Sequence, residues 1–428
     1  MAWRSDVYRY TVPANPMCHT DGQAIPSRRS DASSGPARTS YTSRGQTSLY
    51  RDASTVLAYS ALTCFAFWNY AYGPALTLLR SELEFSYTLL GVYTAAWSAG
   101  PVLTGVVFAR TARRLSREAL VWGSASLASF GAGVFLLGSG LPSTLVGAGI
   151  LGFGGTMLLT VLQAVLSDRH GERRGQALTE ANIGAAACAV FAPLALSALA
   201  VTAVGWRGAL ALPGLGLAVL YLRYRRQMLP QRPGRDSRLR RGRLPVACWL
   251  FAGLAAGSMG VEFCLVYFGA EQLQGTGLST TAAVTAMSSQ YVGLLIGRIG
   301  GALATRSPGR TVPLLYLSLA ATTGGFLLFW LSAVPAIAVL GLLLAGLGIA
   351  NLYPLSLALS LDAAPGQEDQ ANSRSQLLGG LTVMGAPYLL GNLADHLGLS
   401  AAFAIEPVLI GLCLVLLVTG LRARQRAN

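Results

Sequence analysis

Long apolar stretches, each about as long as a membrane-spanning helix, follow one another from residue 55 to residue 421. A helix needs about 20 predominantly apolar residues to cross the hydrocarbon core of a bilayer. Only 12% of the residues are charged, whereas a soluble domain usually carries about 25%. The stretches do not alternate between polar and apolar residues, so they suit helices better than the strands of a barrel. The sequence therefore predicts an all-α protein that crosses a membrane many times.

We expect twelve membrane-spanning helices, separated by short connections that contain Gly, Pro, Ser or charged residues. Their predicted ranges are 55–79, 86–109, 118–138, 143–166, 175–203, 207–224, 245–270, 281–304, 311–332, 336–360, 374–394 and 401–421. Residues 1–54 are rich in Ser, Arg, Thr and Pro and lack the apolar segment of a secretory signal. We expect a disordered cytoplasmic tail there, with a regulatory segment as the alternative.

Basic residues are distributed unequally among the connections, and all 32 are arginine. Seven lie in the tail, four between the second and third spans, three between the fourth and fifth, and nine from Arg223 to Arg243. The opposite set of connections holds only Arg80 and Arg207. Because cytoplasmic loops carry the excess of basic residues, we expect a multi-pass protein of the bacterial inner (plasma) membrane with both termini cytoplasmic. The net charge of +14 reflects this topology, and we expect no nucleic-acid partner.

The second half of the chain repeats the first. At an offset of 194, the coincident pairs are Gly152 and Gly346, Gly154 and Gly348, Asp168 and Asp362, Pro193 and Pro387, Ala200 and Ala394, and Pro213 and Pro407. At an offset of 196, Gly105, Arg110 and Arg114 coincide with Gly301, Arg306 and Arg310. We therefore expect two parallel six-helix repeats, residues 55–224 and 245–424, joined by a basic cytoplasmic linker at 225–244. Transporters built from such repeats bind their substrates between the halves near the bilayer midplane.

Two of the repeated segments contain a recognisable loop motif. "GVVFARTARR" carries Gly105, Arg110, Arg113 and Arg114, and "GALATRSPGR" carries Gly301, Arg306 and Arg310. With these segments, "YGPALTLLRSEL", "LTEAN" and "GLGIANLYPLSLAL", the chain resembles the major facilitator superfamily over residues 55–424, closest in pattern to bacterial drug-efflux and related small-solute permeases. Ala109 and Thr305 replace the Asp of the family motif. The resemblance implies that the arginines brace helix ends at a gate. "GNLADHLG", with Asp395, is similar to the same motif on the opposite side.

Motifs of enzymes are absent or misplaced. "GAGILG" has the spacing of a dinucleotide site, but it lies inside the fourth predicted span and not between a strand and a helix. Small residues at this spacing let membrane helices approach closely. The chain has no lysine for a Walker motif, and its three histidines, His19, His170 and His396, lie in the tail or in loops. We therefore expect no enzyme, no cofactor and no metal site.

Glu262 interrupts the apolar segment "GSMGVEFCLVYFG" near the middle of the seventh predicted span. A charged group at a helix centre costs about 2.5–3.5 kcal/mol even on insertion scales, so it should face a cavity or be paired. We expect Glu262 to bind the coupling proton; a hydrogen bond to a neighbouring polar group is the alternative. Glu180, near the cytoplasmic end of the fifth span, is a second candidate. We expect it to pair with Arg374, its counterpart in the repeat, when the inside is closed, with Arg173 or Arg174 as alternative partners.

Polar and aromatic residues on the predicted spans outline a substrate cavity. We expect it to contain Asn69, Tyr70, Gln163, Gln290, Tyr291, Asn351 and Tyr353. Each of these residues alone more often makes a helix–helix hydrogen bond than a ligand contact. We expect Arg298 to extend toward the cytoplasmic surface, with an anion site as the alternative. Glu406, near the start of the last span, is expected to have a packing or interfacial role.

Together these features predict a secondary transporter, monomeric, that moves a small organic molecule across the lipid bilayer by alternating access with proton coupling. "GAAACAVFAP" keeps the small-residue run and Pro193 of the family's antiporter signature, with Ala192 in place of Gly. The resemblance therefore favours export of a drug or natural product. Proton-coupled uptake of a sugar or small metabolite is the first alternative. A receptor or scaffold with the same fold but no transport is the second, because both loop motifs lack the Asp.

Overall fold

The computed structural model describes residues 51–170, 174–230, 242–305 and 309–427, and every regular element in these ranges is a helix. Residues 1–50 of the predicted tail, most of the predicted linker and Arg306 lie outside the described residues. The N-terminal half contains α1 (Ala53–Leu83), α2 (Tyr87–Arg114), α3 (Arg117–Leu137), α4 (Leu141–His170), α5 (Arg174–Ala200) and α6 (Gly205–Tyr224). The C-terminal half contains α7 (Val246–Gln274), α8 (Thr280–Ala286), α9 (Ser288–Ala304), α10 (Thr311–Leu331), α11 (Pro335–Asp362), α12 (Glu368–Leu397), α13 (Leu399–Ala402) and α14 (Ile405–Ala427).

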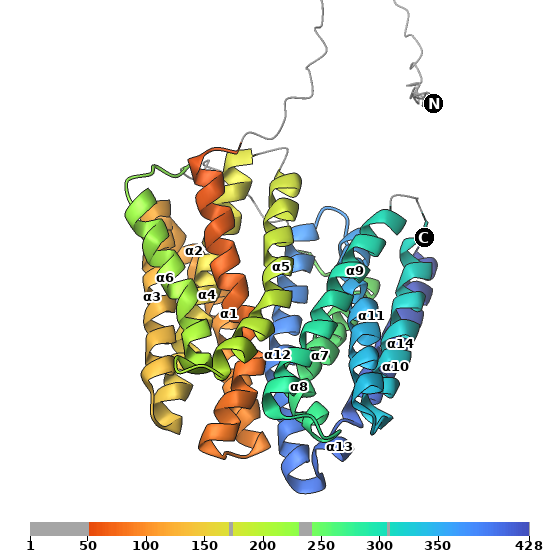
Figure 1. Ribbon diagram of the computed structural model, residues 1–428. Helices are drawn as coiled ribbons and strands as arrows, with labels where there is room; N and C mark the ends of the chain where they lie inside the picture. The colour runs from red at the N-terminus through yellow and green to blue at the C-terminus, as the bar shows by residue number, and fades with distance from the viewer. Residues whose placement is uncertain (1–50, 171–173, 231–241, 306–308, 428) are drawn as a thin grey trace, which may run out of the picture. The chain divides into compact units, whose positions relative to one another are not determined.

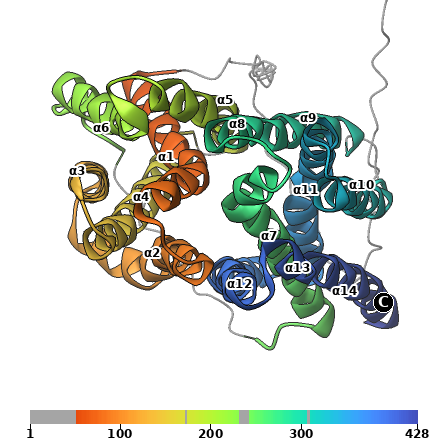
Figure 2. The same ribbon diagram turned by 60° about the horizontal axis from the view of Figure 1, so that its bottom comes forward.

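The long helices run side by side, and each half forms its own bundle (Figure 1). The halves meet where α2 faces α12, where α5 faces α8 and α9, and where α1 faces α7 and α8 (Figure 2). We call the end at which α1 begins and α14 ends the inner end, and the opposite end the outer end. Helix α7 is the most enclosed element of the C-terminal half, since it packs against α11, α12 and α14 as well as against α1.

Ten of the described helical segments are long and apolar enough to cross a membrane, and each coincides with a predicted span. The predicted first span lies within α1, which has 31 residues. The predicted eighth span, 281–304, is divided between α8 and α9 at Met287. The all-helical membrane fold is confirmed, and the break at Met287 within the eighth predicted span was not predicted.

The division at Met287 is a local tightening of the helix. The Met287 N–H is shared between the carbonyls of Ala283 and Val284, and the Gln290 N–H bonds to the Met287 carbonyl at 3.1 Å. These i→i+3 bonds are typical of a short 3₁₀ turn. The apolar pattern continues through the turn, so the sequence carries no sign of it.

Glycines at helix crossings show that the two halves are built alike. In the N-terminal half Gly131 meets Leu151, Gly147 meets Phe135, and Gly154 meets Ala128; in the C-terminal half Gly325 meets Ala345, Gly341 meets Phe329, and Gly348 meets Thr322. Every residue of the second set is the first plus 194. A Cβ at any of these glycines would collide with the backbone of the facing helix, α4 against α3 or α11 against α10. The predicted repeat is therefore confirmed contact by contact, and "GAGILG" serves helix packing.

Candidate functional site

A polar pocket of about 170 Å³ lies among α1, α4 and α5. Its polar lining consists of Asn69 and Tyr70 from α1, Gln163 from α4 and Asn182 from α5, and the remaining lining is aliphatic or aromatic. We call it the amide pocket. Three of the seven predicted cavity residues are thus brought together. Asn182 was not predicted as a lining residue, although its amide side chain inside an apolar span of the sequence could have indicated one.

Tyr70 also lines a second, much smaller cavity of about 10 Å³ between the two halves, which we call the central cavity. Its other lining residues are Ala186 and Ala189 from α5 and Tyr291, Leu294, Leu295 and Arg298 from α9. The Tyr291 hydroxyl donates to the Tyr70 carbonyl at 3.3 Å, and the two rings meet edge to face with centroids 5.2 Å apart. A space of this size holds one water at most. The halves are therefore in close contact at this depth.

Glu262, on α7, is half-buried beside the central cavity. Its carboxylate interacts electrostatically with Arg298 and Tyr291 of α9. Within the part of the chain that the structure describes, no hydrogen bond or close ion pair holds this carboxylate. The predicted alternative, a hydrogen bond to a neighbouring residue, is therefore not what the described residues show.

Arg298 is exposed on α9 and lines the central cavity. It interacts with Tyr70 of α1 as well as with Glu262. That it extends toward the cytoplasmic surface stays a prediction. Tyr291 and Arg298 are seven residues apart, two helical turns, and so share one face. That spacing in the sequence indicates that Tyr291 and Arg298 project from the same side of the helix.

The other predicted cavity residues line neither of these two cavities. Gln290 is fully buried, and its amide has no hydrogen-bond partner among the described residues. Asn351 is buried between α11 and α9, where its amide donates to the Gly297 carbonyl at 3.0 Å. Tyr353 is half-buried and interacts with Gln376 of α12. Asn351 and Tyr353 thus connect neighbouring helices in the same half.

Glu180 lies at the inner end and is held within its own half. Arg51 donates to both of its carboxylate oxygens at 3.1 Å, and the Tyr59 hydroxyl donates at 3.2 Å. Arg374, the partner predicted for the closed inside, is exposed on α12. Arg173 and the side chain of Arg174 lie outside the described residues. In this state the N-terminal start of α1 supplies the counter-charge of Glu180.

The start of α1 is also tied to the end of α4. Asp52 caps α1 by accepting from the Thr55 N–H, and Arg169 donates to Asp52 at 2.7 Å. Partial burial of Asp52 opposes its ionisation, but the hydrogen bonds from Thr55 and the charge of Arg169 hold the pKa of the carboxyl below its ordinary value. Asp52 is therefore ionised at neutral pH.

The loop-motif residues occupy the inner ends of the helices. Arg110, Arg113 and Arg114 are exposed at the end of α2, Arg310 is exposed before α10, Gly105 is exposed on α2, and Gly301 is buried beside Asn351. A brace between helix ends is made instead by Arg117, whose guanidinium donates to Asp168 of α4 at 2.5 Å. Arg117 is buried and was not among the predicted site residues.

A cluster at the outer end joins the two halves, and we call it the outer cluster. Arg80 of α1 donates to Glu271 of α7 at 2.9 Å, and its guanidinium lies 3.9 Å from the centre of the Tyr87 ring. The Asp395 carboxylate of α12 accepts from the backbone N–H groups of Tyr87 at 2.8 Å and of Thr88 at 2.7 Å. Glu271 was missed because it lies near the end of an apolar span, where charge is ordinary.

The described hydrogen bonds and ion pairs between the halves all lie from the middle of the helices to the outer end. Besides the outer cluster and Tyr291, they include Ser197 to the Thr281 carbonyl and Ser288 to the Val190 carbonyl. Gln163 and Asn182 of the amide pocket are exposed. The structure is therefore joined at the outer end, with the amide pocket accessible.

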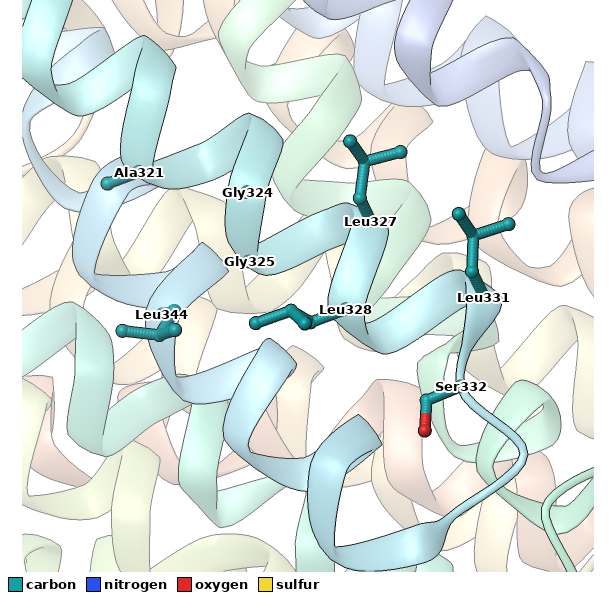
Figure 3. A pocket seen from close by; sticks show the side chains of 8 residues that line it. All are labelled: Ala321, Gly324, Gly325, Leu327, Leu328, Leu331, Ser332 and Leu344. Carbon is teal, nitrogen blue, oxygen red and sulfur yellow. The ribbon is translucent and has the colours of Figure 1, made fainter.

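A larger cavity of about 630 Å³ lies on α10 and α11 (Figure 3). Ser332 is the one residue with a polar side chain among the eight that line it. Leu327, Leu328 and Leu331 are exposed there, as expected for a surface that faces lipid. Nothing in this groove could orient a polar substrate, so its size does not make it the functional site.

Glu406 is a further buried carboxylate, on α14. It is fully buried and faces the Cys264 thiol of α7, with Cys413 nearby. Its environment is a packed interior, in keeping with the predicted packing role. Among the described residues, no cluster of three or more His, Cys, Asp or Glu could hold a metal ion.

Two similar helical bundles, a polar pocket in one of them and hydrogen bonds between them from mid-helix to the outer end are features of a secondary transporter built from repeats. Residues 58–368 match the Major Facilitator Superfamily, and the chain belongs to that family. It is a transporter and not an enzyme. No curated protein matched the chain.

Solved transporters share the fold at low sequence identity. A bacterial homolog to the human lysosomal transporter Spinster, in an inward-facing and occupied conformation, is 17% identical with a TM-score of 0.69, over 89% of this chain and 97% of that one. The nucleoside transporter NupG, as a point mutant, is 14% identical with a TM-score of 0.67, over 86% and 98%. A mutant of the peptide transporter POT in complex with sulfate is 15% identical with a TM-score of 0.70, over 87% and 95%. These similarities concern the fold.

Proposed function

We propose that this protein couples proton movement to the transport of a small organic molecule across the bacterial inner membrane, with the inner end in the cytoplasm. The observation that carries the proposal is the position of Glu262. Its carboxylate interacts electrostatically with Arg298, which lines the cavity between the halves, and is not fixed by a hydrogen bond among the described residues. A carboxylate in such a place changes its proton affinity when its surroundings change.

The two ends of the bundle supply the alternating access. In the observed state the outer cluster closes the outer end, while Glu180 is paired with Arg51 of its own half. Closing the inner end brings α5 toward α12, and Glu180 then exchanges Arg51 for Arg374. Opening the outer end breaks the contact of Arg80 with Glu271.

The direction of transport has two candidates, each with its own observation. The span-five segment with Pro193 favours export in exchange for protons. The position of Arg298 beside Glu262 favours proton symport, because a proton on Glu262 removes the charge that competes for Arg298. A scaffold without transport has no use for a charge held at this depth.

Proton flux in everted membrane vesicles tests the proposal. A pH-sensitive dye in the lumen is followed while small organic acids, bases and neutral metabolites are added outside. Export in exchange for protons makes the lumen more alkaline, whereas symport makes it more acidic. Glu262→Gln should abolish the substrate-dependent flux, and Asp362→Asn, an exposed carboxylate at the end of α11, should not. An unchanged flux in Glu262→Gln would refute the coupling role.

A further inference from the structure

We infer that the transported molecule is an organic anion, whose carboxylate or similar acidic group binds to Arg298 when Glu262 is protonated. The inference rests on the proposed function of this site. It starts from the charges that line the two cavities. Arg298 is the one charged residue among the described side chains that line the amide pocket or the central cavity.

The groups that face Arg298 are few. They are Glu262 from α7 and the Tyr70 hydroxyl from α1. Arg298 is exposed on α9, so a ligand can reach its guanidinium. Among the described residues, no carboxylate makes a hydrogen bond or close ion pair with Arg298. Glu262 therefore compensates the charge at a distance and leaves the guanidinium donors available to a second acceptor.

A guanidinium binds a carboxylate through two parallel N–H···O bonds, a geometry that a lone charge such as lysine cannot supply. The rest of the site suits the body of such a molecule. Tyr70 borders both cavities and the Arg298 side chain is exposed, so a ligand in the amide pocket can place its acidic end beside Tyr70 against Arg298. Asn69, Gln163 and Asn182 then offer hydrogen bonds, and Phe65 and Leu159 offer apolar contact.

The proton on Glu262 and the anion on Arg298 bind with positive linkage. When Glu262 is ionised, it repels an incoming anion and offsets the positive charge of Arg298. When Glu262 is protonated, the pair carries one net positive charge and attracts the anion. By reciprocity, a bound anion raises the affinity of Glu262 for its proton. Proton and anion then move together, so the inference favours symport.

The binding experiment uses the purified full chain in detergent. Benzoate and hexanoate are each compared with their amide and their amine at pH 5.5 and pH 7.5, with ligand-induced thermal stabilisation as the readout. We expect both carboxylates to bind more tightly than the matched amides and amines, and more tightly at pH 5.5. Glu262→Gln should bind the carboxylates equally at the two pH values.

Substitution of Arg298 separates a binding role from a structural one. Arg298→Gln should weaken carboxylate binding by at least about tenfold, since a hydrogen-bonded charge is lost, and leave amide binding unchanged. Arg298→Lys, which keeps the charge, should recover part of the affinity. Arg422→Gln, at an exposed position near the end of α14, should behave as wild type. The inference is wrong if wild type binds no carboxylate, if the amines bind best, or if Arg298→Gln binds carboxylates normally.

The vesicle flux and this binding experiment can fail independently. A flux driven by amines or neutral molecules and lost in Glu262→Gln would leave the proposed coupling intact and exclude an anionic substrate. Carboxylate binding without any proton flux would leave the anionic ligand intact and refute the proposed proton coupling.

Discussion

Two carboxylates within the helices of the C-terminal half have different surroundings. Glu262 is half-buried and interacts with Arg298, a lining residue of the central cavity, whereas Glu406 is fully buried near Cys264 and Cys413. A carboxyl group without a counter-charge in such an interior is neutral. A neutral group that no cavity reaches cannot exchange protons during transport.

We therefore expect Glu406→Gln to transport at the wild-type rate, since it replaces a neutral carboxyl group by a neutral amide of the same shape. Glu262→Gln, the same chemical change at the proposed coupling residue, is the comparison. Rates of substrate-driven proton flux are measured at equal protein content in the vesicles. Loss of flux in Glu406→Gln with normal thermal stability would mean that protons reach α14.

At the scale of single residues, the sequence predicted part of the lining of the amide pocket. Asn69, Tyr70 and Gln163 line the amide pocket as expected because polar residues on central spans face the interior of a bundle. The same rule placed Asn351 in the cavity, but that amide reaches a carbonyl of the neighbouring helix. Which acceptor a buried amide finds depends on tertiary packing, which no local pattern records.

Helix crossings depend on single glycines whose neighbours leave no room for a side chain. Gly131→Ala on α3 should lower the free energy of unfolding by about 1–3 kcal/mol, because its Cβ meets the backbone of Leu151. Gly133→Ala on the same helix, where nothing lies within 4 Å, should be neutral or stabilising. Thermal unfolding in detergent measures both. Equal effects would show that α3 and α4 are less tightly packed than described.

The ends of α1, α7 and α12 hold the outer side closed. Glu271→Gln removes the ion pair with Arg80 and should destabilise the closed outer end by about 1–3 kcal/mol, which is about 5- to 150-fold in population. Pulsed electron paramagnetic resonance between labels at Ser81 and Ala401 should detect a longer distance population. Glu82→Gln breaks a pair with Arg207 inside one half, so its distances should match wild type.

The helices themselves were predictable because lipid demands long apolar runs, and ten of the spans coincide with helices. The turn at Met287 and the contacts of the outer cluster could not be predicted from the sequence. A carboxylate such as Asp395 finds its partners Tyr87 and Thr88 only through the arrangement of two halves. The sequence places these residues more than 300 positions apart.

For the whole molecule, alternating access requires that charges change partners between states. Glu180 is bound to Arg51 while the inner end is accessible. If Arg374 replaces Arg51 after closure, Glu180→Gln and Arg374→Ala should be non-additive in transport rate, with a coupling of about 0.5–3 kcal/mol. A double-mutant cycle on the flux measures this coupling. Additive effects would exclude the exchange of Arg51 for Arg374 as the partner of Glu180. A second cycle, of Glu180→Gln with Arg51→Ala, measures the coupling of the pair that the structure contains.

The two halves were predictable as a whole because duplication leaves a constant offset in the sequence. Glycines 194 positions apart occupy the same crossings, so the repeat is a property of packing and not of composition. Solved transporters at 14–17% identity share the fold. The substrate does not follow from this architecture, because it depends on a few side chains such as Arg298.

The first turn of α2 is completed by the other half of the protein. Ser86 accepts from the Leu89 N–H, while Asp395 accepts from those of Tyr87 and Thr88. These two amides lose their acceptor whenever the outer end opens, and water then reaches them. Their hydrogen–deuterium exchange rates therefore report the fraction of time that the protein spends open to the outside, without any label. A substrate that stabilises either state will change those two rates before its site is known.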